Sequence, residues 1–103
     1  MLTVIETEEF LAWYAQVWSD DERDAFVDWI AVNPDEGDVI PGTGGLRKVR
    51  WSRAGVGKRG GARVINYLRR SEGQVVLLLV YAKAKYDSLR PEFLRKLKEK
   101  HDD

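Results

Sequence analysis

The chain has 103 residues, 44% hydrophobic and 33% charged, with a formal net charge of zero. This length suits one domain with one modest core, residues 1–103, and excludes two domains. The absence of cysteine excludes disulfides, thiolate metal sites and a cysteine nucleophile. No run approaches the roughly 20 apolar residues of a membrane span, and the start MLTVIETEEF lacks the basic and apolar regions of a signal peptide. We therefore expect a cytoplasmic protein without a membrane partner.

The N-terminal segment predicts a short strand and then an amphipathic helix. Residues 3–6 read as the strand. From Phe10 to Trp18, apolar residues recur at i, i+1, i+4, i+7 and i+8, which is one face of a helix. Glu8 and Glu9 lie in its first turn, where negative charge favours the helix dipole.

A second helix is bounded by signals at both ends. Ser19 and Glu22 form a capping box at its start. Asn33-Pro34 ends it, because the residue before proline is disfavoured in the helical region. The glycine-rich residues 35–45 that follow are expected to form a loop.

The hydrophobic period then changes to two, which predicts strands. Residues 46–52 alternate, residues 53–61 form a glycine-rich basic loop, and residues 62–70 read as the next strand. Ser71-Glu72-Gly73 predicts a hairpin turn before residues 74–83. The run VVLLLVY in this last strand is apolar on both faces, so it should be a buried interior strand.

Pro91 predicts the start of a final helix, because proline suits the first helical turn. Asp102 and Asp103 should be a frayed tail. The predicted element order is β-α-α-β-β-β-α, with two helices before an antiparallel meander and one after it. The expected fold class is therefore α+β.

The neutral net charge hides a strong asymmetry between two parts of the chain. The segment from Met1 to Asp38 holds eleven acids and one base, Arg23, whereas the segment from Val39 to Ser71 holds no acid at all. The bases of this second segment are Arg47, Lys48, Arg50, Arg53, Lys58, Arg59, Arg63, Arg69 and Arg70. Because electric fields act locally, we expect a basic face that binds a polyanion.

The composition of the chain disfavours several kinds of catalytic site. His101 is the only histidine and lies near the C-terminus, which disfavours a serine–histidine–aspartate triad and a histidine metal site. GTGGLRK does not have the spacing of a phosphate-binding P-loop. We expect no metal and no cofactor. The glycines of residues 55–61 fit either close approach of a phosphate backbone or an ordinary hairpin loop.

Strand alternation suggests which basic side chains act together. Side chains that should share a face within their strands are Lys48 with Arg50, Arg63 with Tyr67, and Tyr81 with Lys83. If these faces coincide, the sheet presents several cations and two phenols to one phosphate backbone. A solvated sheet face is the alternative, but the absence of acids over this segment favours nucleic-acid contact.

Such a surface has the groups needed to cleave RNA without histidine. RNA carries its own nucleophile, the 2′-hydroxyl, so an enzyme has to align it, stabilise negative charge and transfer two protons. Arginines can stabilise the charge, and lysine or tyrosine can transfer protons. A purely structural role for Arg63 would be an ion pair with an acid such as Asp38.

Three motifs resemble those of a known family. GDVIPGTGGLRKVRW, GKRGGARVINY and LLLVYAKAKYDSL are similar, at these spacings, to the RelE superfamily of bacterial toxins and to its HigB-like branch. The match covers about residues 37–89, and the preceding β-α-α order also agrees.

The resemblance implies a fold, an activity and a partner. The fold would be RelE-like, a twisted antiparallel sheet packed by helices. The activity would be ribosome-dependent mRNA cleavage that inhibits translation, by a metal-independent endoribonuclease toxin of a type II toxin–antitoxin system. The partners would be the ribosome, mRNA and a cognate antitoxin, typically a small helix-turn-helix protein.

The resemblance also assigns residues to the site. The catalytic residues that it implies are Lys48, Arg50, Arg63, Tyr81 and Lys83. The RNA-binding residues are Arg47, Arg53, Lys58, Arg59 and Tyr67. Asn66 departs from the family pattern, which often has an aromatic residue there, and Tyr86 matches a tyrosine near the last helix only by approximate position. The alternative is a non-catalytic RNA- or DNA-binding module that uses the same basic sheet.

Overall fold

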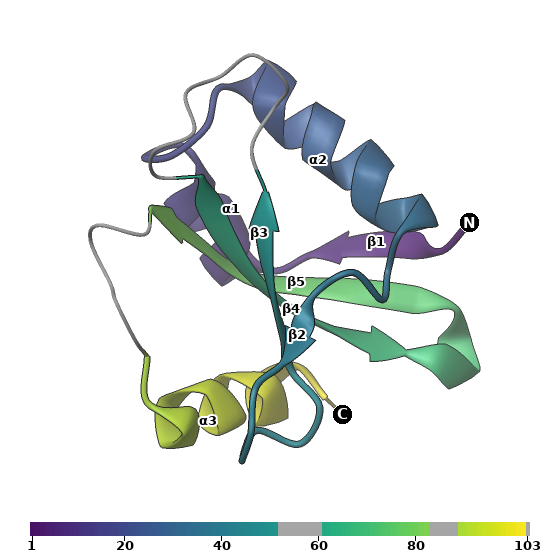
Figure 1. Ribbon diagram of the computed structural model, residues 1–103, viewed down its shortest axis with the longest axis vertical. Helices are drawn as coiled ribbons and strands as arrows, with labels where there is room; N and C mark the ends of the chain where they lie inside the picture. Colours follow the sequence, from purple (N-terminus) through teal and green to yellow (C-terminus); the bar gives the residue numbers. More distant parts are fainter. Residues whose placement is uncertain (52–60, 83–88, 103) are drawn as a thin grey trace.

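A computed structural model describes residues 1–51, 61–82 and 89–102. Within them, five strands form one mixed sheet in the order β1-β5-β4-β3-β2, as Figure 1 shows. The strands are β1 (Thr3–Glu6), β2 (Asp38–Val39), β3 (Arg47–Trp51), β4 (Ala62–Arg69) and β5 (Gln74–Ala82). The helices are α1 (Glu8–Tyr14), α2 (Asp20–Val32) and α3 (Pro91–His101), with a short 3-10 helix η1 (Arg70–Glu72) between β4 and β5.

The predicted α+β class is confirmed, but the sheet is not entirely antiparallel. β1 pairs in parallel with β5, whereas all other pairings are antiparallel. The expected loop at residues 35–45 contains the short strand β2, which pairs with β3. β5 lies between β1 and β4, as its continuous apolar run predicts. None of the helices in the described ranges has the length and apolar character needed to cross a membrane.

Helices cover both faces of the sheet. On one face, α1 and α2 bury Phe10, Phe26 and Ile30 against strand residues such as Val64 and Leu77. On the other face, α3 buries Leu94 and Leu97. The two cores follow from the alternation of side chains along each strand. β4 and β5 therefore lie between two layers of packed side chains.

The capping signals of α2 operate as the sequence predicts, whereas α1 is shorter than expected. Ser19 and Glu22 form the capping box of α2, with Ser19 Oγ accepting from the Glu22 amide at 3.2 Å. Asn33 caps the other end of α2. α1 ends at Tyr14, but Trp18 is still buried in the α1–α2 core because the chain folds back into it.

The turn between β4 and β5 also differs from a simple hairpin. Arg70–Glu72 forms the 3-10 helix, and Gly73 ends it with a φ of 65°. A left-handed φ costs glycine little, because it has no Cβ.

Asp102 is not part of a frayed tail, contrary to the prediction, and Asp103 lies outside the described residues. His101 lies in α3, and its Nε2 is 2.7 Å from Glu9 Oε1. Lys100 also binds the carboxylates of Glu8 and Glu9. Lys98 Nζ donates to Asp102 Oδ2 at 2.7 Å. The contacts of Lys100 and His101 tie the end of α3 to the start of α1.

We expect this tie to weaken in acid. Burial alone would raise the pKa of Glu9, but hydrogen bonds from Lys100 and His101 outweigh it and lower the pKa from 4.5 to about 2. A carboxyl whose pKa falls on folding stabilises the fold above its unfolded pKa, and that stability is lost as the pH falls from 4.5 towards about 2. Urea unfolding across this range should show that the free energy of unfolding falls less with decreasing pH in Glu9→Gln than in the parent chain. Glu99→Gln, a change at an exposed glutamate of α3, is the matched control. Its free energy of unfolding should fall with pH as much as that of the parent chain.

Candidate nucleic-acid interface

Three of the residues implicated in catalysis form one row across the sheet. Arg50 on β3 pairs with Arg63 on β4, and Arg63 pairs with Tyr81 on β5. Directly paired residues point to the same face, and neighbouring strands are about 4.8 Å apart, so the row spans roughly 10 Å. The tertiary structure thus brings together side chains that are far apart in sequence.

Lys48 lies on the same face as this row. It is two residues before Arg50 on β3, and both side chains are exposed. Lys48 pairs with Ile65 on one side and with Asp38 of β2 on the other. The acid suggested as a structural partner of Arg63 therefore lies opposite Lys48 instead. We call Lys48, Arg50, Arg63 and Tyr81 the basic row.

Arg63 is the most unusual member of the basic row. It is only 9% exposed, and its Nη1 donates to the Gly61 carbonyl oxygen at 2.8 Å. Among the described residues it has no carboxylate within ion-pair distance. Buried charges are normally paired, and like charges directly opposite on neighbouring strands destabilise a sheet. A buried arginine beside another arginine, with one carbonyl partner, is therefore suited to binding an anion.

Tyr81 completes the row with a protonated phenol. Its side chain is 3% exposed, and burial raises its pKa above the ordinary 10.0, against the opposing effect of the nearby Arg63 charge. The phenol is therefore neutral at pH 7 and can donate a hydrogen bond or a proton.

The pairing of β4 with β5 shifts register next to the basic row. Ile65 pairs with Leu79 and Asn66 with Leu77, so Leu78 is an extra residue on β5. Both Leu78 and Leu79 consequently pack in the core under α3. Bulges of this kind re-aim the side chains on either side of them. The alternation in the sequence carries no signal for this one.

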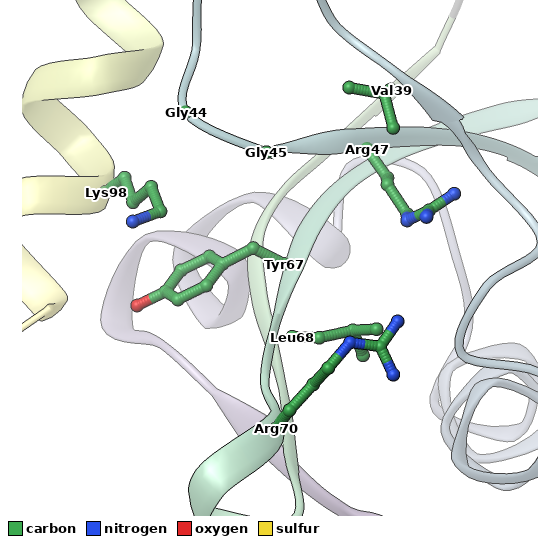
Figure 2. A pocket seen from close by; sticks show the side chains of 8 residues that line it. All are labelled: Val39, Gly44, Gly45, Arg47, Tyr67, Leu68, Arg70 and Lys98. Atoms are coloured by element: carbon green, nitrogen blue, oxygen red, sulfur yellow. The ribbon is translucent and has the colours of Figure 1, made fainter.

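Arg47 and Tyr67, both implicated in RNA binding, lie away from the basic row. Arg47 points to the opposite face, where its Nη1 donates to the Gly37 carbonyl oxygen at 2.7 Å. Tyr67 is on the face of the row but is buried under α3, and its hydroxyl accepts from Arg69 Nη2 at 3.1 Å. Figure 2 shows the two side chains pointing away from each other. The remaining implicated residues, Arg53, Lys58, Arg59 and Lys83, lie outside the described residues, as does Tyr86.

No arrangement for a metal is present in the described part of the chain. No group of three or more histidine, aspartate or glutamate side chains there is placed to hold an ion. Compared with models of known protein families, the chain matches none.

Asn66, next to the register shift, is also a buried polar residue. The residue is 0% exposed, and neither of its side-chain amide atoms has a hydrogen-bond partner among the described residues. An unpaired buried amide costs about 1–3 kcal/mol. In the sequence, Asn66 stands out only as a departure from a family pattern. Its burial depends on tertiary packing, for which the sequence carries no local signal.

We expect Asn66→Leu to stabilise the fold, because leucine has nearly the same shape and carries no unpaired polar atom. The free energy of unfolding should rise by about 1 kcal/mol or more. Asn66→Asp, which buries a charge at the same place, should lower it. Urea unfolding of both variants measures these changes, and a loss of stability in Asn66→Leu would show that the amide has a favourable partner in solution.

Proposed function

We propose that this protein is a metal-independent endoribonuclease that cleaves mRNA on the ribosome, with a RelE-like fold, acting in the cytoplasm. A cognate antitoxin, of the small helix-turn-helix kind, would neutralise it. The observation that carries the proposal is Arg63, a nearly buried guanidinium without a carboxylate partner in the described residues, in one row with Arg50 and Tyr81. The motif resemblance to RelE-type toxins supports the same activity.

The basic row offers a role for each of its groups. Arg63 and Arg50 would bind the oxygens of the scissile phosphate, with arginine donating two parallel hydrogen bonds where lysine cannot. The 2′-hydroxyl oxygen would attack the phosphorus and lose its proton to a base, for which Lys48 and Lys83 are the candidates. The bond to the 5′-oxygen would break, and the neutral Tyr81 phenol would supply the proton to this leaving group. The negative charge that develops on the phosphate would be stabilised by the two arginines.

Mapping of RNA ends tests the proposal. Induced expression of the chain should arrest bacterial growth and produce new 5′ ends within translated mRNA. With purified components, we expect cleavage of mRNA on programmed ribosomes. The double variant Lys48→Ala/Arg50→Ala should reduce the rate by at least about a hundredfold, as loss of transition-state cations does. Lys96→Ala, a change at an exposed lysine of α3, is the control and should keep the parental rate.

The alternative function is a non-catalytic RNA- or DNA-binding module that uses the same face. In that case RNA would bind without new 5′ ends, and folded protein would leave growth and mRNA intact. The double variant would then weaken binding and reduce its salt dependence, because each phosphate contact releases counterions. This outcome would refute the nuclease and retain the nucleic-acid interface.

A further inference from the structure

One side of β4 lacks a strand partner over its last three residues. β4 pairs with β5 as far as Arg69, opposite Gln74. Its pairing with β3, however, stops at Asn66, opposite Arg47. Within the described residues, Tyr67, Leu68 and Arg69 therefore have a neighbouring strand on one side only. An open strand edge presents backbone donors and acceptors that can pair with another chain.

The chain that precedes β3 turns away at this point and leaves a cavity. If the β3–β4 register continued, Gly45 would lie opposite Leu68. Gly44 and Gly45 instead have φ values of 75° and 103°, which bend the backbone away from β4. An open cavity of about 250 Å³ lies in this gap. Its lining residues are Val39, Gly44, Gly45, Arg47, Tyr67, Leu68, Arg70 and Lys98, shown in Figure 2.

The lining of this cavity is basic. It contains three cations, Arg47, Arg70 and Lys98, and none of the lining residues is acidic. Arg47 and Arg70 share one carboxylate, with Asp35 Oδ1 at 3.8 Å from Arg47 Nη2 and 2.9 Å from Arg70 Nη2. Two guanidinium groups on a single carboxylate leave an excess positive charge at the cavity. A second carboxylate would be bound there favourably.

We propose that the open edge of β4 binds an extended, acidic segment of a partner protein, which adds a strand to the sheet in the place that β3 leaves. Backbone hydrogen bonds to those N–H and C=O groups of Tyr67, Leu68 and Arg69 that point away from β5 would hold the segment, as in other cases of strand addition. Charge complementarity with Arg47 and Arg70 would select an acidic side chain. The inference does not depend on RNA cleavage, because this edge is separate from the basic row.

The two sides of the cavity also define which positions of the segment matter. Arg47 and Arg70 extend to one side of β4, whereas Tyr67 and Lys98 lie on the other, as Figure 2 shows. Because side chains alternate along an extended segment, an acid facing the two arginines places its neighbours on the side of Tyr67 and Lys98. The Lys98 ammonium on that side is already paired with Asp102, so the segment should alternate acidic and apolar residues.

Amide NMR with a synthetic peptide tests the proposal. The probe is an N-acetylated, C-amidated peptide of about eight residues in which glutamate alternates with valine. We expect saturable shifts at the amides of Tyr67, Leu68 and Arg69, and slowed hydrogen exchange at those of the three that point away from β5. Arg70→Ala, at an exposed side chain, should weaken binding by about tenfold. Arg90→Ala, a change at the exposed arginine directly before α3, should leave the affinity unchanged.

Four results would overturn the proposal. One is the absence of saturable shifts at these amides with about 2 mM peptide, a concentration that detects dissociation constants of about 1 mM. Another is equal binding of a peptide with lysine in place of glutamate. A third is parental affinity in Arg70→Ala. The last is an equally strong response of these amides to inorganic phosphate or a short RNA, which would make the cavity a phosphate site instead of a protein-docking edge.

Discussion

Arg63→Ala should lower the rate of ribosome-dependent mRNA cleavage about a hundredfold, which corresponds to on the order of 3 kcal/mol of transition-state stabilisation. The reason is that Arg63 lies between Arg50 and Tyr81 in the sheet, and within the described residues only the Gly61 carbonyl accepts from its guanidinium. The fold and antitoxin binding should survive, because no ion pair within the described residues depends on this side chain. Arg63→Lys should recover only part of the activity, since lysine lacks the two parallel donors.

Melting temperature and cleavage have to be measured on the same preparations to separate catalysis from stability. If Arg63→Ala melts much earlier but, while folded, still cleaves at the parental rate, the residue is structural. If growth arrest and cleavage persist at full rate without loss of stability, Arg63 has no role in the reaction. Lys96→Ala again serves as the control for removal of one positive charge from the surface.

Phe26→Ala should lower the free energy of unfolding by about 3–5 kcal/mol, because it removes a fully buried ring. The Phe26 ring centroid lies 5.2 Å from that of Trp18 and 5.4 Å from that of Trp51. Domains of this kind have only about 5–15 kcal/mol of stability, so the variant should melt more than about 10 °C earlier.

The loss should also reach the basic row. Trp51 directly follows Arg50 on β3, so a cavity beside Trp51 loosens the end of the strand that positions this arginine. Thermal unfolding followed by circular dichroism provides the measurement. Val32→Ala, at an exposed residue of α2, is the control and should change the melting temperature little. Equal melting temperatures for the two variants would mean that the aromatic cluster adds no stability at Phe26.

Local signals in the sequence determined most of the secondary structure. Signals at helix ends affect only the few residues next to them. The ends of α2 lie where the Ser19–Glu22 capping box and Asn33-Pro34 predict, and α3 starts where Pro91 predicts. The two-residue period and the run VVLLLVY likewise predicted β3, β4 and an interior β5. Alternation also predicted that Lys48 shares a face with Arg50.

The pairing of distant segments was decided only by the tertiary structure. The tertiary structure pairs β1 in parallel with β5 and brings Arg50, Arg63 and Tyr81 into one row. Both depend on the register between strands, which no local pattern encodes. Packing of α3 buries Tyr67, and a turn of backbone at Gly44 and Gly45 opens the edge of β4. Alternation assigns a side chain to one of two faces, but burial and charge pairing depend on which element covers that face.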